Sequence, residues 1–171
     1  MVMDRAQSRG RETTAAASGA LLPSALAETL RREAEAAWPR ECCGLLLGAP
    51  STHESVTLAS VPRIVRTVPA SNVATDPLRH FEIDPAVLIA AHRAARHGGP
   101  RVLGYYHSHP SGIAAPSATD KAQAAGDGSI WAIIACAAAP GAGGSATAGD
   151  IRLWADRPDG FVALSSPRAE G

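Results

Sequence analysis

The stretch Val102-Leu103-Gly104-Tyr105-Tyr106-His107-Ser108-His109-Pro110 decides the fold, because an apolar run there ends in two histidines separated by one residue. The run predicts a strand that delivers the histidines at its end. In a strand, residues i and i+2 point to the same face, so the imidazoles of His107 and His109 converge on one point. Two converging imidazoles are what a metal ion requires.

A serine and an aspartate extend this pair to a full set of candidate ligands. Seven residues separate His109 from Ser117, and Asp120 follows three positions later, at the predicted start of a short helix. Two imidazoles and one carboxylate leave a coordination position for water, as in a catalytic zinc site and unlike a closed structural one. The Ser-x-x-Asp spacing is also typical of a helix N-cap with an acid in the first turn. We expect that one carboxylate cannot both accept backbone amides and point fully at a metal.

Glu41 is the candidate for the catalytic base. It is a charged residue at the head of the apolar run 41–48, where a carboxylate costs free energy unless it is paired or functional. Hydrolysis needs a group that takes a proton from water and returns it to the leaving amine. The alternative is a strand-end charge that faces solvent. Cys42 and Cys43 also allow a thiol nucleophile, although cysteines in an apolar strand usually behave as small hydrophobes.

Length and composition restrict the class of protein. The chain has 171 residues, 46% hydrophobic and 19% charged, which is enough for one domain with a real core. The formal net charge is +0, so we expect no nucleic-acid partner. No apolar run approaches the roughly 20 residues of a membrane helix, and no apolar segment follows the early arginines, so neither a membrane span nor a signal peptide is expected. Three cysteines, two of them adjacent, indicate a reducing compartment and therefore the cytoplasm.

The rest of the chain mixes helices and strands. Helices are predicted from the N-cap Ser24 to Pro39, from Asp84-Pro85 to Gly98, and from Ser117 to about Gly126. Strands are predicted at 41–48, 55–61, 101–107, 129–137, 150–155 and 160–164, the first two as a hairpin. Loops are predicted at 62–80, 110–116 and the Ala/Gly/Ser-rich 138–149. The predicted fold class is therefore α/β or α+β.

Glu41, the run His107-x-His109-Pro110, Ser117 and Asp120 together match the JAMM (MPN-plus) motif of zinc metalloproteases at every signature position. The resemblance implies that His107, His109 and Asp120 bind Zn²⁺ and that Glu41 is the general acid/base. It implies that Ser117 stabilises the tetrahedral intermediate. Residues 43–48 also resemble the first strand of small prokaryotic members. The implied fold is JAMM/MPN-like, a cytidine-deaminase-like curved mixed sheet flanked by helices.

The resemblance covers residues 21–165, and we predict disordered tails at 1–20 and 166–171. It implies a zinc-dependent metallopeptidase or isopeptidase that cleaves after the C-terminal Gly-Gly of a ubiquitin-like or sulfur-carrier protein. The implied partner is that carrier as substrate. The sequence leaves the oligomeric state open, with a homodimer as one alternative. Two alternatives remain open. One is a catalytically silent MPN-type scaffold that binds proteins, and the other is a non-haem iron site, which also uses two histidines and one carboxylate.

Overall fold

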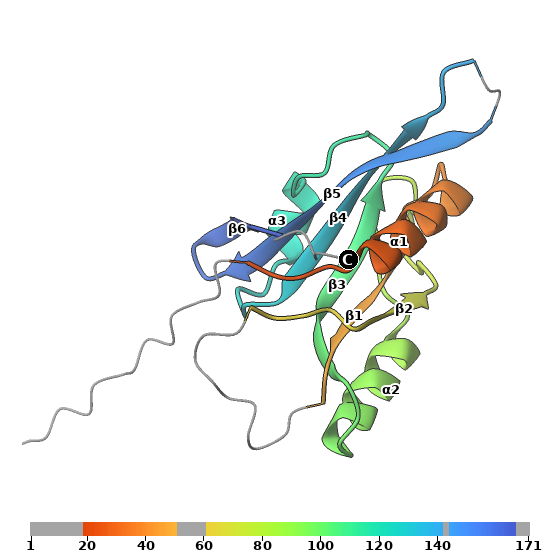
Figure 1. The fold of residues 1–171 in the computed structure, drawn as a ribbon. Coiled ribbons are helices and arrows are strands. Elements are labelled where there is room, and N and C mark those ends of the chain that lie inside the picture. The colour runs from red at the N-terminus through yellow and green to blue at the C-terminus, as the bar shows by residue number, and fades with distance from the viewer. Residues whose placement is uncertain (1–18, 51–60, 142–143, 167–171) are drawn as a thin grey trace, which may run out of the picture.

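The computed structural model describes residues 19–50, 61–141 and 144–166, and within them it contains three helices and one six-stranded sheet (Figure 1). The helices are α1 (Ser24–Ala37), α2 (Pro85–Arg96) and α3 (Ala118–Gln123). The strands are β1 (Cys43–Gly48), β2 (Arg66–Ala70), β3 (Arg101–His109), β4 (Ile130–Ala138), β5 (Ala146–Arg157) and β6 (Gly160–Leu164). The predicted α+β class, with a mixed sheet flanked by helices, is confirmed.

The strand order is β2-β1-β3-β4-β5-β6, which places β3 inside the sheet. β3 and β4 are parallel, and every other neighbouring pair is antiparallel. A parallel pair needs a crossover connection, and here residues 110–129 make it with α3 on the way. The connection begins at the end of β3, so α3 returns close to the two histidines.

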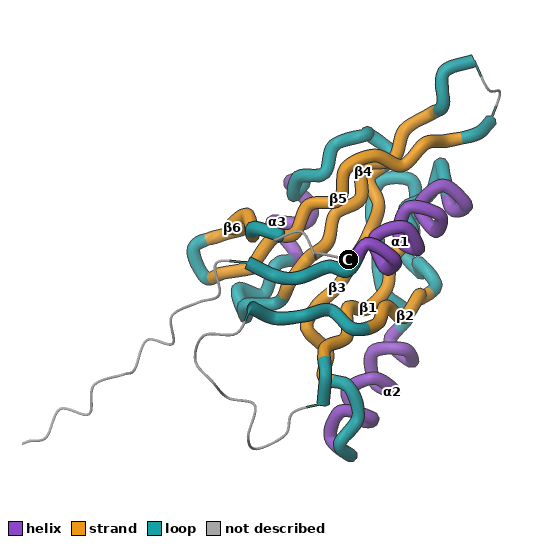
Figure 2. The backbone as a smooth tube through the Cα atoms, in the orientation of Figure 1, coloured by secondary structure: helices purple, strands orange, loops and turns teal. Residues whose placement is uncertain are grey.

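Side-chain alternation in the strands builds a core on each face of the sheet. Leu46, Tyr106 and Ile134 lie in the cluster that α1 covers through Leu30 and Ala34. The opposite cluster packs against α2 and contains Leu45, Leu47, Phe81 and Trp131. Figure 2 shows the strands side by side with the helices outside them. His107 and His109 have the parity of the second cluster, so they point to the α2 side.

The two longer helices begin in different ways. Asp84 caps α2, because its Oδ1 accepts the Ala86 N–H at 2.9 Å, and Pro85 follows at the first helical position as predicted. The N-cap of α1 is Pro23, which has no capping side-chain bond, and Ser24 is the first helical residue. The prediction of Ser24 as N-cap is therefore wrong by one residue. Burial of Leu30 and Ala34 stabilises α1 in place of a cap.

Residues 62–80 were predicted to be a loop, but Arg66–Ala70 form β2, which pairs antiparallel with β1. β2 is an edge strand with mostly partly or fully exposed residues, so it lacks the apolar pattern that identifies a buried strand. Pro69 fits such an edge, where a missing N–H is tolerated. The strand predicted at 55–61 lies almost wholly outside the described residues, and the structure gives β2 as the outer partner of β1.

The predicted loop 138–149 is also partly strand. Ala146 pairs with Ala138 and Thr147 with Ala137, so β4 and β5 continue as a two-stranded arm. Small side chains do not prevent this pairing, because the main chain makes the hydrogen bonds. α1 supports the arm, since Glu35 accepts the Ala148 N–H at 2.9 Å.

A close contact between β1 and β3 fixes the strand that precedes the site. A Cβ on Gly44 would lie 2.5 Å from the ring and the hydroxyl of Tyr106, so only glycine fits. The Tyr106 hydroxyl donates to Glu33 Oε2 at 2.5 Å, which links α1 to the same point. Cys43 pairs with His107 in this register, so the start of β1 lies beside the histidines.

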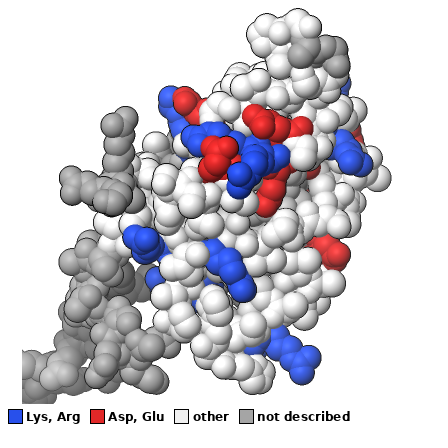
Figure 3. Space-filling model, turned by 45° about the vertical axis from the view of Figure 1, so that its right-hand side comes forward, with Lys and Arg blue, Asp and Glu red and all other residues white. Residues whose placement is uncertain are grey.

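The surface drawn in Figure 3 carries positive and negative side chains intermixed in one cluster, with large uncharged areas around it. This distribution agrees with the formal net charge of +0. No helix within the described residues is long and apolar enough to cross a bilayer.

Candidate metal centre and catalytic site

The two histidines of β3 point to one place, as their spacing predicts. His107 is fully buried and His109 is 6% exposed, and their Nε2 atoms lie 2.8 Å apart. The Phe81 ring stacks on the His107 ring at a centroid distance of 4.2 Å and fixes its plane. The strand and this aromatic contact therefore preorganise the imidazole pair.

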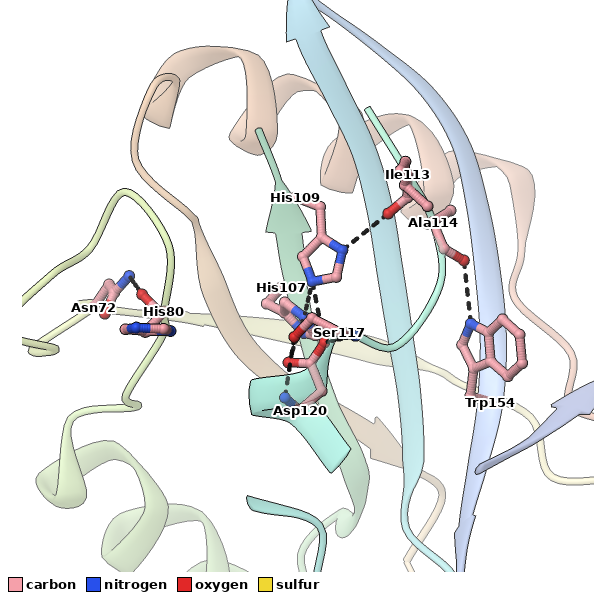
Figure 4. Close-up of polar contacts among 9 residues, drawn as sticks. All are labelled: Asn72, His80, His107, His109, Ile113, Ala114, Ser117, Asp120 and Trp154. Atoms are coloured by element: carbon pink, nitrogen blue, oxygen red, sulfur yellow. Dashed lines mark hydrogen bonds and ion pairs between the residues drawn. The ribbon is translucent and has the colours of Figure 1, made fainter. Parts of the chain in front are cut away.

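Asp120 reaches the same point from α3 (Figure 4). Its Oδ1 lies 3.2 Å from His107 Nε2, and its Oδ2 lies 3.2 Å from His109 Nε2. The ligand atoms of the three residues all fall within 4.8 Å of one another, and all three side chains are buried. Two nitrogens and one carboxylate oxygen in this arrangement suit Zn²⁺ with an open fourth position.

Asp120 is at the same time part of a helix cap. Ser117 Oγ accepts the Asp120 N–H at 3.1 Å, and Asp120 Oδ2 accepts the Ser117 N–H at 2.7 Å, which is a capping box. The cap and the approach to both imidazoles coexist in this geometry, because the carboxylate has two oxygens with two lone pairs each. That the same carboxylate cannot also point fully at a metal stays a prediction. Oδ1 faces His107, whereas Oδ2 serves both the cap and the side of His109.

The tautomer of His109 also fits a metal ligand. Its Nδ1 lies 2.9 Å from the Ile113 carbonyl oxygen, which can only accept, so Nδ1 carries the proton. Nε2 then presents its lone pair toward His107 and Asp120. A backbone carbonyl in this position is the usual outer support of a metal-bound histidine. His107 Nδ1 is buried and has no hydrogen-bond partner among the described residues.

The charges of the cluster depend on one another. Burial lowers the pKa of His107, and the hydrogen bond with Asp120 opposes this only in part. Burial also acts to lower the pKa of His109, but the contacts with Asp120 outweigh it and the pKa is raised. Burial acts to raise the pKa of Asp120, yet the hydrogen bonds from both imidazoles hold it well below its usual range. The carboxylate is therefore ionised at neutral pH, as a metal ligand must be.

Glu41 lies two residues before the start of β1 and is 6% exposed. Among the described residues, none donates a hydrogen bond to its carboxylate. Burial raises the pKa of Glu41 to about 7, the charge of His109 opposes the shift, and the charges of Asp120 and Asp76 add to it. A carboxyl group with a pKa near neutrality can both accept and return a proton.

The loop 71–83 holds the Glu41 peptide and was not predicted to contribute to the site. The Glu41 N–H donates to the Pro77 carbonyl at 2.8 Å, and the Glu41 carbonyl accepts from Asn72 Nδ2 at 3.0 Å. The same loop contains Phe81. The only signal in the sequence was the length of the predicted loop, which is typical of functional loops.

The neighbouring cysteines are unsuited to nucleophilic chemistry. Burial raises the pKa of both the Cys42 and the Cys43 thiol to about 12, so each is protonated at neutral pH. Cys43 Sγ donates to the Ala70 carbonyl at 3.8 Å. These features favour a structural role in the strand.

A cavity of about 560 Å³ lies next to the cluster. The loop 71–83 lines it with Asp76, His80 and Phe81, and α3 lines it with Thr119 and Gln123. Phe81 is shared between the cavity wall and the His107 contact, so its ring separates the cavity from His107. Glu41 and the three candidate ligands do not line this cavity.

Two curated proteins match part of the chain. A desampylase from Haloferax volcanii is 37% identical over 95 residues, which are 56% of this chain and 62% of that protein. A probable TtuB-protein conjugate cleaving protease from Thermus thermophilus is 32% identical over 99 residues, 58% of this chain and 59% of that protein. The chain thus matches about three fifths of the length of these relatives.

Two solved structures share the fold over most of the chain. A protein from Desulfitobacterium hafniense superposes with a TM-score of 0.66 at 26% identity and covers 88% of this chain and 93% of its own. A protein from Salinibacter ruber gives a TM-score of 0.57 at 28% identity, with coverage of 88% and 92%.

The family model described as prokaryotic homologs of the JAB domain matches residues 23–154, a range that includes Glu41, both histidines, Ser117 and Asp120. The match spans more than half of the chain and agrees with the JAMM resemblance of the five-residue pattern. The chain therefore belongs to the prokaryotic homologs of the JAB domain.

Proposed function

We propose that this protein is a JAMM-type zinc metallopeptidase that hydrolyses the peptide or isopeptide bond after the C-terminal Gly-Gly of a ubiquitin-like or sulfur-carrier protein. The observation that carries the proposal is the buried cluster of His107, His109 and Asp120 beside a buried Glu41 whose pKa is about 7. The names of the two curated relatives, a desampylase and a conjugate cleaving protease, support this class of reaction.

His107, His109 and Asp120 would hold the ion through two Nε2 atoms and a carboxylate oxygen. Zinc bound there supplies Lewis-acid chemistry, since it polarises a carbonyl and lowers the pKa of water. Glu41 takes a proton from the attacking water on its carboxylate and then delivers it to the leaving amine. In the metal-free fold the pKa of Glu41 is about 7, so this carboxyl group is able to both accept and release a proton near neutral pH.

Ser117 acts at the developing oxyanion in this proposal. Its Oγ accepts the Asp120 N–H with a lone pair, and this bond leaves the hydroxyl proton available to donate. A preorganised donor of this kind stabilises negative charge in the transition state without further rearrangement. The capping box supports the role, because it fixes the Ser117 backbone at the helix start.

An extended substrate tail suits the surroundings of the site. Main-chain pairing beside a strand would hold a Gly-Gly tail without large side chains. Leu78 and Ile113 expose 51% and 61% of their surface on the two loops that flank the cluster, and they offer apolar contacts to a carrier protein. We infer a cytoplasmic location, which the three free cysteines support.

The test is cleavage of a panel of carrier proteins that end in Gly-Gly, each joined to a lysine side chain or extended by one residue. We expect hydrolysis that stops with a chelator and returns with Zn²⁺, with about one zinc per chain by metal analysis. Binding of carriers without cleavage by a zinc-free protein would instead favour the scaffold. Activity lost only in the absence of oxygen would favour an iron oxygenase.

A further inference from the structure

Glu41 precedes the residues of β1 that pair with neighbouring strands. The last paired residue of β1 toward Glu41 is Cys43, opposite Ala70 on one side and His107 on the other. Beyond it, Cys42 still bonds to β3, since its N–H donates to Ser108 Oγ at 2.9 Å. The peptide groups of Glu41 instead bond to the loop 71–83, at the Pro77 carbonyl and the Asn72 side chain. The position of Glu41 therefore depends on a loop.

Asn72 is the point at which this loop is tied together. Its Nδ2 donates to the carbonyls of Glu41 and His80, both at 3.0 Å. Its Oδ1 accepts the N–H groups of Ala74 at 3.0 Å and Glu82 at 3.1 Å. A primary amide has two donor hydrogens and two acceptor lone pairs, and all four are used here. The partners also fix the orientation of the amide, because carbonyls face only its nitrogen and N–H groups face only its oxygen.

The same loop supports the metal-binding half of the site. Glu82, which donates to Asn72, is adjacent to Phe81, and Phe81 stacks on His107. Figure 4 shows the Asn72 amide directed at the backbone beside His80, on the far side of His107 from Ser117. One side chain thus connects the Glu41 peptide to the segment that fixes the His107 ring.

We propose that Asn72 is a positioning residue of the hydrolytic site, which holds the Glu41 peptide at a fixed place relative to His107 through its four hydrogen bonds. The proposal rests on the proposed function of Glu41 as acid/base. Asn72 acts through Glu41 and does not need to contact the substrate. Its removal should therefore lower kcat more than it changes KM, since proton transfer is sensitive to small displacements of the base.

The sharpest variant is Asn72→Asp. It keeps the size of the side chain and the two acceptor bonds to Ala74 and Glu82. It replaces the donor nitrogen with an oxygen that faces the carbonyls of Glu41 and His80, so the hydrogen bonds to these two carbonyls are broken, and it adds a negative charge near Glu41. A loss of kcat that is shared with the uncharged Asn72→Ala is therefore due to lost positioning and not to the added charge. Asn72→Ala removes all four bonds and serves as the larger change.

Asp84→Ala is the matched control. Asp84 lies just after the loop and caps α2 through the Ala86 N–H, so its loss also destabilises this part of the fold. Asp84 makes no side-chain bond to Glu41 or Asn72 among the described residues. Any loss of activity that follows only from lower stability should appear in this variant as well.

The experiment compares the three zinc-loaded variants with the wild type by kcat, KM, zinc content, Tm and the amide hydrogen exchange of Glu41. For Asn72→Asp we expect kcat to fall by at least about tenfold, with KM and zinc content within about threefold. The Glu41 amide, which donates to Pro77, should exchange at least about tenfold faster. Asp84→Ala should lower Tm and leave kcat and the Glu41 exchange at wild-type values.

Three outcomes would overturn the proposal. These are a wild-type kcat in Asn72→Asp, an unchanged exchange rate of the Glu41 amide, or an equal loss of kcat in Asp84→Ala at a similar Tm. A wild type that cleaves no carrier would contradict the proposed function instead. The exchange of the Glu41 amide would then still decide whether Asn72 holds this peptide.

Discussion

Two buried carboxylates, at the two ends of the paired strands β3 and β4, differ in the hydrogen bonds that they accept. Asp156 is 1% exposed, and its Oδ2 accepts the N–H groups of Ala125 at 2.8 Å and Gly126 at 3.0 Å. Glu41 is 6% exposed, and among the described residues its carboxylate accepts no hydrogen bond. Both side chains have lost most of their contact with water, but only Asp156 has backbone donors in exchange.

We expect this difference to separate a structural carboxylate from a reactive one. Backbone amides satisfy part of the hydrogen-bonding capacity of a buried carboxyl group, so its burial costs less free energy. The fold is able to supply such amides, as the turn at Ala125 and Gly126 demonstrates. Near the histidines, no backbone amide of the described residues donates to the Glu41 carboxylate, and burial raises the pKa of Glu41 to about 7. Perturbed groups of this kind concentrate at functional sites.

The largest effect is expected when a candidate metal ligand beside Glu41 is removed. His109→Ala should abolish hydrolysis and reduce zinc to well below one per chain, because one of three ligands is lost. Activity and bound metal are the measurements. His92→Ala, at an exposed position of α2, should change neither. Full zinc content in the His109 variant would contradict the ligand set.

The second test separates metal binding from proton transfer. Glu41→Gln should lower kcat by about 10³-fold, within the range expected for a general acid/base, while zinc stays near one per chain. Asp156→Asn is the matched change at the structural carboxylate, and its kcat should stay within about threefold of the wild type. Equal losses of kcat in the two variants would remove the distinction between the two groups.

The third test uses the pH dependence of stability in the metal-free protein. The pKa of Glu41 is about 7 in the fold and 4.5 ordinarily, so between these values the folded chain holds a proton that the unfolded chain has released. The stability contributed by this proton is complete below pH 4.5 and is lost as the pH rises through 7.

Glu41→Gln removes this loss. Relative to the wild type, the variant should therefore gain up to about 3 kcal/mol in free energy of unfolding between pH 4.5 and 8. Urea denaturation of both proteins in chelator at several pH values measures the difference. A constant difference across this range would show that Glu41 is not buried as an acid.

The smallest effect is expected at the structural carboxylate. Asp156→Ala should lower the free energy of unfolding by about 2 kcal/mol, because two partly buried hydrogen bonds to the N–H groups of Ala125 and Gly126 are lost. Its kcat at a temperature well below Tm should equal that of the wild type. A loss of kcat without a loss of stability would mean that Asp156 also serves the site.

Sequence and structure agree best where local rules apply. The i, i+2 spacing on a strand was enough to place His107 and His109 on one face. Asp120 was identified as the third residue because its spacing from the histidines matches the JAMM motif. β2 was missed because an exposed edge strand with a proline lacks an apolar pattern. Asn72 and Phe81 were missed because they act through contacts between segments that are distant in the sequence, such as the bond between Asn72 and Glu41, which are 31 positions apart.

The capping box of α3 has a consequence for how the site assembles. α3 has six residues, too few to be stable as an isolated helix, and its third residue is the candidate ligand Asp120. Helix formation and cation binding then draw on the same carboxylate, and their free energies are reciprocally linked. Whatever factor an ordered α3 adds to the affinity for the ion, the ion adds to the population of ordered α3. If Asp120 binds the ion as proposed, we expect a substitution on the outer surface of this short helix, such as at Lys121, to change the metal affinity without altering a ligand.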